Sequence, residues 1–211
     1  MSLVQPVPTP QRMTVQEYLD FEATSETKHD YVDGYLVDVR AMAGTTVDHS
    51  RIERNWIMAL SKRLDGKPCE AFGSSLKVRA AKRTNYRYPD LSVGCKPLQF
   101  DDRESTSRTL LNPTLVVEIL SDSTGSEDRG QKFTEYREIE SFREYVLTSQ
   151  SAPSVEVFYK RDDGQWLFNF SSGLEASIKL LSLGIEVPLS EIYAGVTFPK
   201  PAPDPVDPST N

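Results

Sequence analysis

The sequence predicts a mixed α/β (α+β) domain with a central sheet flanked by helices. The expected order of elements is a long helix, three strands, a second helix and a further strand, which is typical of a mixed α/β layer. One strand, "PTLVVEIL" at 113–120, is apolar on both faces, which indicates a central strand covered on both sides. The length of 211 residues suits one domain with small appendages.

Short-range signals predict the N-terminal elements. Thr14 and Glu17 form a capping box that opens a short helix over 14–23. In "KHDYVDGYLVDV", two strand-like runs surround Asp33 and Gly34, a pair that favours a type I′ hairpin turn. A long amphipathic helix is expected over 49–65, where five apolar residues recur at helical spacing: Ile52, Trp56, Ala59, Leu60 and Leu64.

The rest of the chain is expected to be mostly strands. "AFGSSLKVRAA", "RYPDLSVGC" and "PTLVVEIL" predict three of them, and a helix follows over 127–140. "REYVLTS", "SVEVFYK" and "QWLFNFS" predict further strands, and "LSLGIEVPLSEIYAGV" a strand or turn with a short helical turn. The ends, 1–12 and 199–211, are rich in Pro and are expected to be disordered, so the folded domain spans 13–198.

Composition narrows the class of protein. The net charge of −7 argues against a protein that coats nucleic acid by bulk charge. It does not exclude a nucleic-acid enzyme, whose contacts with its substrate can be local. Cys69 and Cys95 stand in unrelated contexts, so no disulfide framework is expected and a reducing, cytoplasmic compartment is the default. With His29 and His49 as the only histidines, a His/Cys metal cluster is excluded. No run reaches membrane-spanning length and no signal peptide is recognisable.

Glu118 is an acid in the middle of an otherwise apolar strand. It shares a strand face with Val116 and Leu120, while the opposite face is also apolar. A carboxylate buried there must be ligated, paired or protonated. The strand alone does not separate a functional Glu118 from a structural one.

Asp90 provides a possible partner for Glu118. It follows Pro89 in "YPDLSV", and because Pro is confined to edges, first residues and bulges of strands, Asp90 is expected near an irregular point. A turn or bulge Asp is the alternative. Two acids on successive strands can converge at one end of a sheet, and oxygen ligands suit Mg²⁺ or Mn²⁺. As a pair, the two acids predict a metal site.

The helix after the Glu118 strand carries a third candidate. Asp128, Lys132 and Tyr136 fall at i, i+4 and i+8 on one helix face. Asp128 and Lys132 fit a surface ion pair, and they equally fit a helix that directs Lys132 at the metal. Periodicity does not choose between these two interpretations.

Four segments in this order resemble a known family: "YPDLSVGC", "NPTLVVEILSDST", "DRGQKFTEYREI" and "SFREYVLTS". They look like the Uma-type family of putative restriction endonucleases, which belongs to the PD-(D/E)XK nuclease superfamily. The resemblance covers roughly residues 13–195. It implies a restriction-endonuclease-like core, preceded here by an N-terminal helix and hairpin.

The resemblance also implies site residues. Asp90 and Glu118 match the two metal-binding acids of the superfamily, with the backbone carbonyl of Ile119 as a further ligand. The usual catalytic Lys position, two residues after the Glu, holds Leu120 here. The Uma-type family supplies a Lys from the following helix, which would be Lys132. Burial and the cation are expected to lower the pKa of Lys132.

Two further positions match recurrent family residues. Asp30, before the hairpin, stands where the family usually has Glu, and this shorter side chain would reach a metal through a water. His49 opens the long helix, and local hydrogen bonding at the helix N-terminus is the favoured interpretation of it.

A basic run leads to Asp90. "KVRAAKRTNYR" places Lys77 and Arg79 on one strand face, and Tyr86 is placed to stack. Such a run either neutralises DNA phosphates beside the metal site or forms a solvated hairpin. The residues expected to bind nucleic acid are Lys77, Arg79, Lys82, Arg83 and Arg87.

The expected function is that of a Mg²⁺- or Mn²⁺-dependent endonuclease that hydrolyses phosphodiester bonds in DNA. Asp90, Glu118 and Lys132 are the expected catalytic residues, and a homodimer is expected because a symmetric pair suits cleavage of both strands. Leu120, Asp30 and the acidic composition keep a catalytically degenerate nucleic-acid or protein binding module open. A metal-dependent hydrolase of another substrate also stays open, as does a domain in which Glu118 is purely structural.

Overall fold

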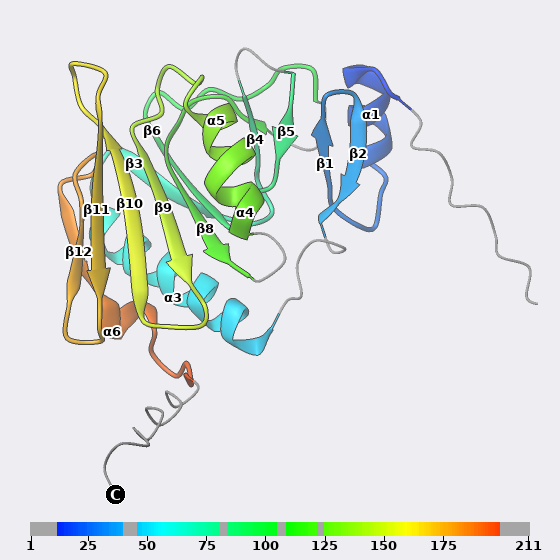
Figure 1. Ribbon diagram of the computed structural model, residues 1–211. Coiled ribbons are helices and arrows are strands. Elements are labelled where there is room, and N and C mark those ends of the chain that lie inside the picture. The colour runs from blue at the N-terminus through cyan, green and yellow to red at the C-terminus, as the bar shows by residue number, and fades with distance from the viewer. Residues whose placement is uncertain (1–11, 40–45, 81–83, 105–108, 122–124, 199–211) are drawn as a thin grey trace, which may run out of the picture.

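A six-stranded mixed sheet forms the centre of the computed structural model, which describes residues 12–39, 46–80, 84–104, 109–121 and 125–198 (Figure 1). The strand order is β11-β10-β9-β8-β6-β3. Neighbours are antiparallel except β8 and β9, which run parallel. The strands are β3 (Cys69–Gly73), β6 (Leu91–Cys95), β8 (Pro113–Leu120), β9 (Glu144–Ser149), β10 (Ser154–Lys160) and β11 (Trp166–Ser172).

A second, five-stranded sheet lies beside the first, with the order β2-β1-β5-β4-β7. Its strands are β1 (His29–Val32), β2 (Tyr35–Asp38), β4 (Lys77–Arg79), β5 (Tyr86–Arg87) and β7 (Thr109–Leu110). Helix α1 (Val15–Glu22) packs on this sheet through Tyr18 and Leu19, which cluster with Tyr31 and Tyr86. A separate hairpin is formed by β12 (Ser177–Leu180) and β13 (Ile185–Pro188).

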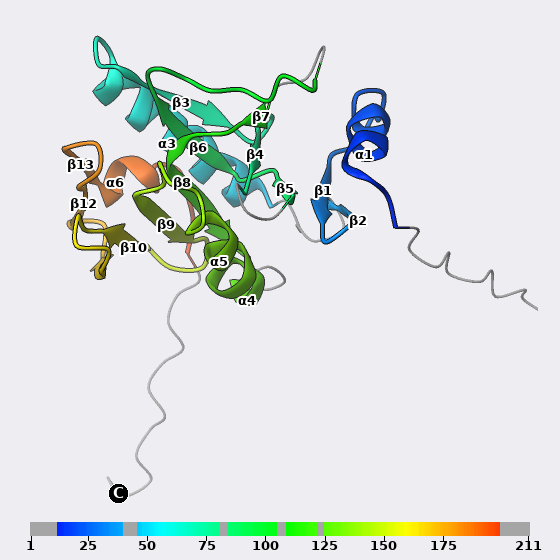
Figure 2. The same ribbon diagram turned by 90° about the horizontal axis from the view of Figure 1, so that it is seen from above.

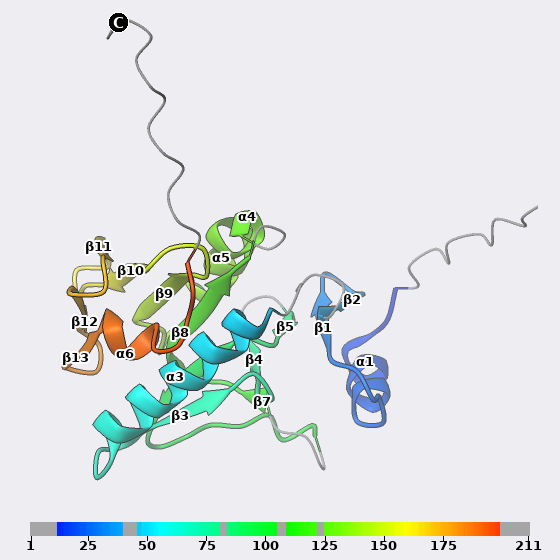
Figure 3. The ribbon, with the colours of Figure 1, turned by 90° about the horizontal axis from the view of Figure 1, so that it is seen from below.

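Helices cover both faces of the central sheet. Helix α3 (Val47–Leu64) lies on one side, together with α6 (Leu189–Ile192), and the segment α4 (Gly125–Glu127), η1 (Asp128–Lys132) and α5 (Phe133–Tyr136) lies on the other (Figures 2 and 3). The restriction-endonuclease-like mixed architecture expected from the sequence is therefore confirmed. In the described part of the chain, no helix is both long and apolar enough to cross a membrane.

Strand β8 is covered on both faces, as its sequence predicts. Leu115 and Val117 belong to the core cluster that contains the apolar face of α3. Val116 and Leu120 belong to the cluster on the opposite face, with Tyr136 of α5. Because the strand is central and covered on both faces, the side chain of Glu118 is removed from bulk water.

The N-terminal predictions are also confirmed. Thr14 accepts a hydrogen bond from the Glu17 main chain while the Glu17 side chain accepts from the Thr14 main chain, which is the capping box. Asp33 and Gly34 have φ of 51° and 98° between β1 and β2, as a type I′ turn requires.

Two expected strands are each divided in two, and two further strands have no counterpart among the expected elements. The run 71–81 separates into β3 and β4, which join different sheets after a turn at Ser74 and Ser75. The run 87–95 divides around Pro89, which has no N–H for a ladder. The second helix ends at Tyr136 instead of residue 140, and the short strands β7 and β12 carry no strong pattern. The terminal segments expected to be disordered lie outside the described residues, apart from Arg12.

Cys69 and Cys95 form a disulfide, contrary to the expectation from sequence. They are directly paired residues of the neighbouring strands β3 and β6, so their sulfurs meet although 26 residues separate them in sequence. The pairing is not visible in the sequence, because it depends on the strand register, which is a tertiary feature.

Reduction of this disulfide is expected to lower the free energy of unfolding by roughly 3 kcal/mol, since the bond constrains the unfolded chain. Urea unfolding with and without reductant measures this, and the double variant Cys69→Ala/Cys95→Ala provides a control that reductant should not affect. Equal stability of the oxidised and reduced protein would contradict a structural role for the bond.

Candidate active site

A cavity of about 50 Å³ lies between the end of β8, α3 and η1. Its wall contains every residue for which the sequence suggested chemistry at a metal site: Asp30, His49, Asp90, Glu118, Ile119 and Lys132. Among the described residues, Val39, Tyr88, Ser121 and Asp128 also line it. Residues spread over about half of the chain thus meet at one point.

Asp90 reaches the cavity because it directly precedes β6. Leu91 pairs with Val117 of the antiparallel strand β8, which places Asp90 beside the Glu118 end of that strand. Oδ2 of Asp90 accepts a hydrogen bond from the main-chain N–H of Ile119 at 2.6 Å. The break in the strand at Pro89 therefore positions an acid against β8, as the sequence suggested.

Glu118 is only 2% exposed. Its Oε1 accepts a hydrogen bond from the Tyr136 hydroxyl at 3.2 Å and lies 3.4 Å from Nζ of Lys132. Burial raises the pKa of Glu118 well above its usual range; the charge of Lys132 opposes this rise, and the charges of Asp128 and Asp90 add to it. The ionised carboxylate is thus under-stabilised and would favour an additional cation.

Lys132 is buried and bonds to two acids. Its Nζ lies 2.8 Å from Oδ1 of Asp128, in addition to the contact with Glu118. The i, i+4 pair predicted on this helix face therefore exists, but as part of the cavity wall instead of the surface. Burial lowers the pKa of Lys132, yet the charges of Glu118 and Asp128 outweigh it and raise the pKa above its ordinary value. The lowering of the Lys132 pKa expected from sequence depends on a bound cation as well as on burial, and it stays a prediction for the metal-bound protein.

His49 contacts the site directly. Its main-chain N–H donates to Thr46 Oγ1, which is the local capping expected from sequence, but its ring Nε2 lies 3.1 Å from Oδ1 of Asp90. Burial lowers the pKa of His49, while the hydrogen bond and charge of Asp90 raise it above the ordinary value overall. Ring Nδ1 is buried and has no hydrogen-bond partner among the described residues. The favoured local interpretation of His49 is therefore incomplete, because sequence spacing cannot show that α3 begins next to Asp90.

Asp30 lines the cavity with both carboxylate oxygens engaged. Oδ1 accepts from the Tyr88 main-chain N–H at 2.8 Å, and Oδ2 accepts from Arg87 Nη1 at 3.1 Å. The residue is 4% exposed. Because Oδ2 of Asp30 is paired with the Arg87 guanidinium, a role through a water or through Arg87 is favoured over direct ligation of a metal.

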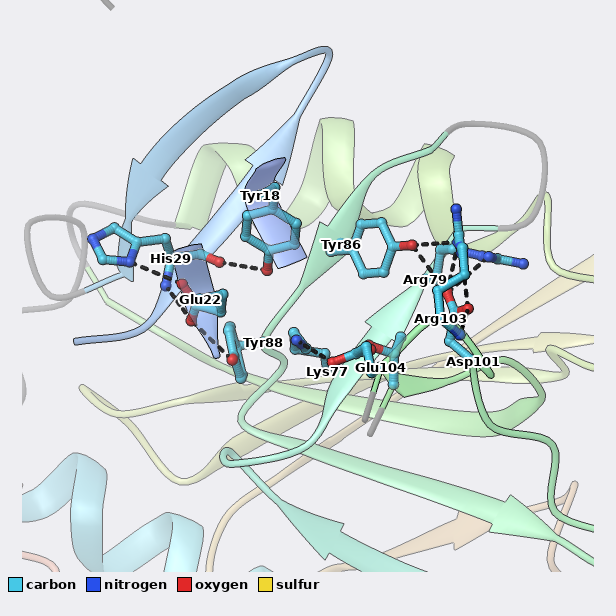
Figure 4. A network of polar contacts seen from close by, with 11 residues as sticks. Tyr18, Glu22, His29, Lys77, Arg79, Tyr86, Tyr88, Asp101, Arg103 and Glu104 are labelled. Carbon is cyan, nitrogen blue, oxygen red and sulfur yellow. Dashed lines mark hydrogen bonds and ion pairs between the residues drawn. The ribbon is translucent and has the colours of Figure 1, made fainter. Parts of the chain in front are cut away.

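Two of the expected DNA-binding residues are buried, and this part of the prediction is wrong for the folded chain. Lys77 and Arg87 are each 1% exposed, so phosphates cannot reach them. Lys77 pairs with Glu104 at 2.6 Å, as Figure 4 shows, and Arg87 is enclosed by three acids: Asp30, Glu127 and Glu135.

Arg79 is partly exposed and shares one acid with a second arginine. Its guanidinium donates to Asp101, which also accepts from Arg103 and from the Tyr86 hydroxyl (Figure 4). Lys82 and Arg83 lie outside the described residues. Within the described part of the basic run, Lys77 and Arg87 are therefore structural residues of the second sheet, and Arg79 is the one with a partly exposed guanidinium.

Tyr88 is a cavity residue that sequence reasoning missed. Its hydroxyl donates to Glu22 of α1 at 2.9 Å, and Glu22 also contacts His29 Nδ1 at 3.0 Å (Figure 4). The position of Tyr88, two residues before Asp90 in "YPD", was the available signal. It links the cavity to the N-terminal helix.

The donor set fits a hard divalent cation with few protein ligands. No group of three or more His, Cys, Asp or Glu side chains in the described ranges is arranged to hold a metal. The expected set needs fewer, because Asp90, Glu118 and the carbonyl of Ile119 are oxygen donors and Mg²⁺ retains several waters. The buried, under-stabilised carboxylate of Glu118 is the feature that agrees best with such an ion.

The mixed sheet with helices on both faces is a restriction-endonuclease-like fold. A family model described as "Putative restriction endonuclease" (Uma2) matches residues 15–190, and the chain belongs to this family. The family membership and the fold agree with the resemblance found in the sequence.

The chain is also similar to individual proteins along most of its length. The chain is 36% identical over 188 residues to the Synechocystis sp. protein slr1290, covering 89% of this chain and 94% of the relative. It is 32% identical over 173 residues to sll1609 of the same organism, covering 82% and 95%. A crystal structure of "a putative nuclease belonging to DUF820" from Anabaena variabilis ATCC 29413 superposes with a TM-score of 0.68 and 16% identity over 86% of this chain and 97% of that chain. At that identity the likeness shows the fold alone.

Proposed function

We propose that this nuclease-family chain is a divalent-metal-dependent endonuclease that hydrolyses phosphodiester bonds in DNA. One observation carries the proposal: acids from two neighbouring strands and a Lys from the following helix line one small cavity. The strand position that usually holds the catalytic Lys, two residues after the Glu, is Leu120 here and carries no charge. Lys132 from the following helix lies 3.4 Å from Glu118 and can supply the missing cation.

Asp90, Glu118 and the main-chain carbonyl of Ile119 would hold Mg²⁺ or Mn²⁺. When bound, the ion supplies Lewis-acid activation of the phosphodiester and of the attacking water. His49 holds Asp90 in place through Oδ1, and Ile119 does so through Oδ2. Tyr136 orients the Glu118 carboxylate in the same way.

Lys132 would act on the substrate as a charged donor. Its ammonium group orients the attacking water and stabilises the negative charge that develops on the phosphoryl oxygens. The expected products carry a 5′-phosphate and a 3′-hydroxyl. Asp128 keeps the Lys132 ammonium group directed along the cavity wall.

A homodimer and a cytoplasmic location are parts of the same proposal. Two symmetric copies suit cleavage of both strands of a duplex. A reducing cytoplasm would open the Cys69–Cys95 disulfide, so counting free thiols on protein trapped directly from cells distinguishes that compartment from an oxidising one.

Cleavage of supercoiled plasmid DNA with Mg²⁺ or Mn²⁺ tests the proposed activity. The wild-type chain is expected to produce nicked and linear forms, and EDTA is expected to abolish them. Binding of the metal without cleavage of DNA or RNA would instead indicate a hydrolase of another substrate or a degenerate site.

A second candidate function has specific support: a catalytically degenerate module that binds nucleic acid or protein. Leu120 occupies the usual Lys position, and Asp30 is engaged by Arg87 and Tyr88. DNA binding without cleavage, unchanged by Glu118→Gln, is the result that would favour this module.

A further inference from the structure

The segment that delivers Lys132 is a π-helical turn, η1, which spans Asp128–Lys132 between two α-helical pieces. Such turns alter the register of side chains around a helix and leave main-chain groups in need of other partners. We propose that Tyr145 and Arg87 are positioning residues that hold this turn in the register that presents Lys132 to Glu118. The inference rests on the proposed function and extends it to residues outside the cavity wall.

Tyr145 anchors the start of the turn to the central sheet. Its hydroxyl donates to the main-chain carbonyl of Asp128 at 2.9 Å, and its side chain is fully buried. Tyr145 stands on β9 directly beside Val116 of β8, the strand that carries Glu118. One sheet therefore fixes both Glu118 and the first residue of η1. The Tyr145 ring also stacks on Phe133, the residue after the turn, with centroids 5.0 Å apart and planes 3° from parallel.

Arg87 holds the turn from its two flanks. It donates through Nη1 to Glu127, the residue before η1, at 2.8 Å. It also donates through Nε and Nη2 to both oxygens of Glu135, in α5, at 2.9 and 3.0 Å. A bidentate guanidinium–carboxylate contact restricts rotation as well as distance. Because Glu135 is fully buried, this clamp is shielded from water and from salt.

Lys132 needs such anchors because it does not belong to the strand that carries Glu118. A Lys on β8 would be fixed to Glu118 by the strand itself, two residues away. Lys132 belongs to a different element, so its distance from Glu118 depends on how the turn sits on the sheet. A displacement of about 1 Å in a reacting group can cost up to about 100-fold in rate.

Tyr145→Phe is the sharpest test because it removes one oxygen atom and keeps the ring stack. We expect kcat for plasmid cleavage to fall about 10- to 100-fold with KM little changed. Tyr18→Phe is the matched control: it also removes a bond from a fully buried Tyr hydroxyl to a main-chain carbonyl, that of His29, but lies in α1. Its kcat per folded molecule should equal that of the wild type.

The Lys132→Ala background separates positioning from general loss of stability. If Tyr145 acts through Lys132, then Tyr145→Phe should cause no further loss of kcat in that background. Equal kcat in Tyr145→Phe and Tyr18→Phe, or a full additional loss without Lys132, would overturn the proposal.

Arg87 is best probed through Glu127, since removing Arg87 would leave Asp30 and Glu135 buried without their partner. Glu127→Ala removes the acceptor of the Arg87 Nη1 hydrogen bond at a side chain that is 23% exposed. It is expected to lower kcat several-fold, and an unchanged kcat would overturn the role of the Arg87 clamp.

Amide hydrogen exchange makes the test independent of catalysis. Exchange over residues 128–132 is expected to be faster in Tyr145→Phe than in the wild type and Tyr18→Phe. If the wild type cleaves no nucleic acid, the proposed function fails while this exchange measurement still decides whether Tyr145 anchors the turn. Unchanged exchange would refute the anchor.

Discussion

Glu118→Gln is expected to lower the rate of plasmid cleavage on the order of 1000-fold. The amide keeps the size of the side chain and can still accept the hydrogen bond from Tyr136, but it loses the charge that would hold the metal. Asp90→Asn is expected to have the same effect for the same reason. Glu191→Gln, which changes a surface acid paired with Arg63, is the control that should leave cleavage unchanged.

Glu118→Gln is also expected to raise the free energy of unfolding at neutral pH. Because burial raises the pKa of Glu118, the folded protein holds that proton more tightly than the unfolded chain does. The contribution of Glu118 to stability is therefore most favourable at acid pH and is lost as the pH rises above about 4.5 and through the raised pKa. Thermal melts from pH 4 to pH 8 should show that the melting temperature of Glu118→Gln increasingly exceeds that of the wild type as the pH rises.

Full cleavage activity in Glu118→Gln would exclude Glu118 as a metal ligand.

Lys132→Ala is expected to lower kcat on the order of 100-fold while the protein still binds Mn²⁺. The loss follows from removing the cation beside Glu118, whereas Asp90 and Glu118 remain to hold the ion. Stability is also expected to fall by roughly 3 kcal/mol, because Glu118 and Asp128 would stay buried without their common partner.

Rates per folded molecule and Mn²⁺ titration by calorimetry separate the two effects. Lys96→Ala, at an exposed position near Glu70, is the control for loss of a lysine. Full activity of folded Lys132→Ala would refute its catalytic role. Loss of Mn²⁺ binding together with activity would make Lys132 a residue that only maintains the site.

The convergence of the two candidate metal ligands, Asp90 and Glu118, was predictable because local sequence encodes it. The apolar residues on both faces around Glu118 mark a doubly covered strand, and Pro89 marks the break before β6. Antiparallel pairing of β6 with β8 then places Asp90 beside Ile119. These features depend on periodicity and on backbone chemistry, which sequence contains.

Other features depend on contacts between distant segments, and sequence does not contain those. In the sequence, Lys77 and Arg87 look like surface cations. In the fold both are buried, and each pairs with an acid from a remote segment: Lys77 with Glu104 and Arg87 with Glu135. Cys69 meets Cys95 only through the β3–β6 register. His49 contacts Asp90 only because the first turn of α3 lies against the cavity.

A crystal structure of the wild-type chain soaked in Mn²⁺ tests the central claim most directly. We predict an anomalous peak that contacts carboxylate oxygens of both Asp90 and Glu118, with the Ile119 carbonyl as a further ligand, and we predict that Glu118→Gln crystals lack it. A wild-type crystal with Mn²⁺ bound elsewhere, or with none between these two acids at millimolar concentration, would contradict a metal-dependent nuclease site in this cavity.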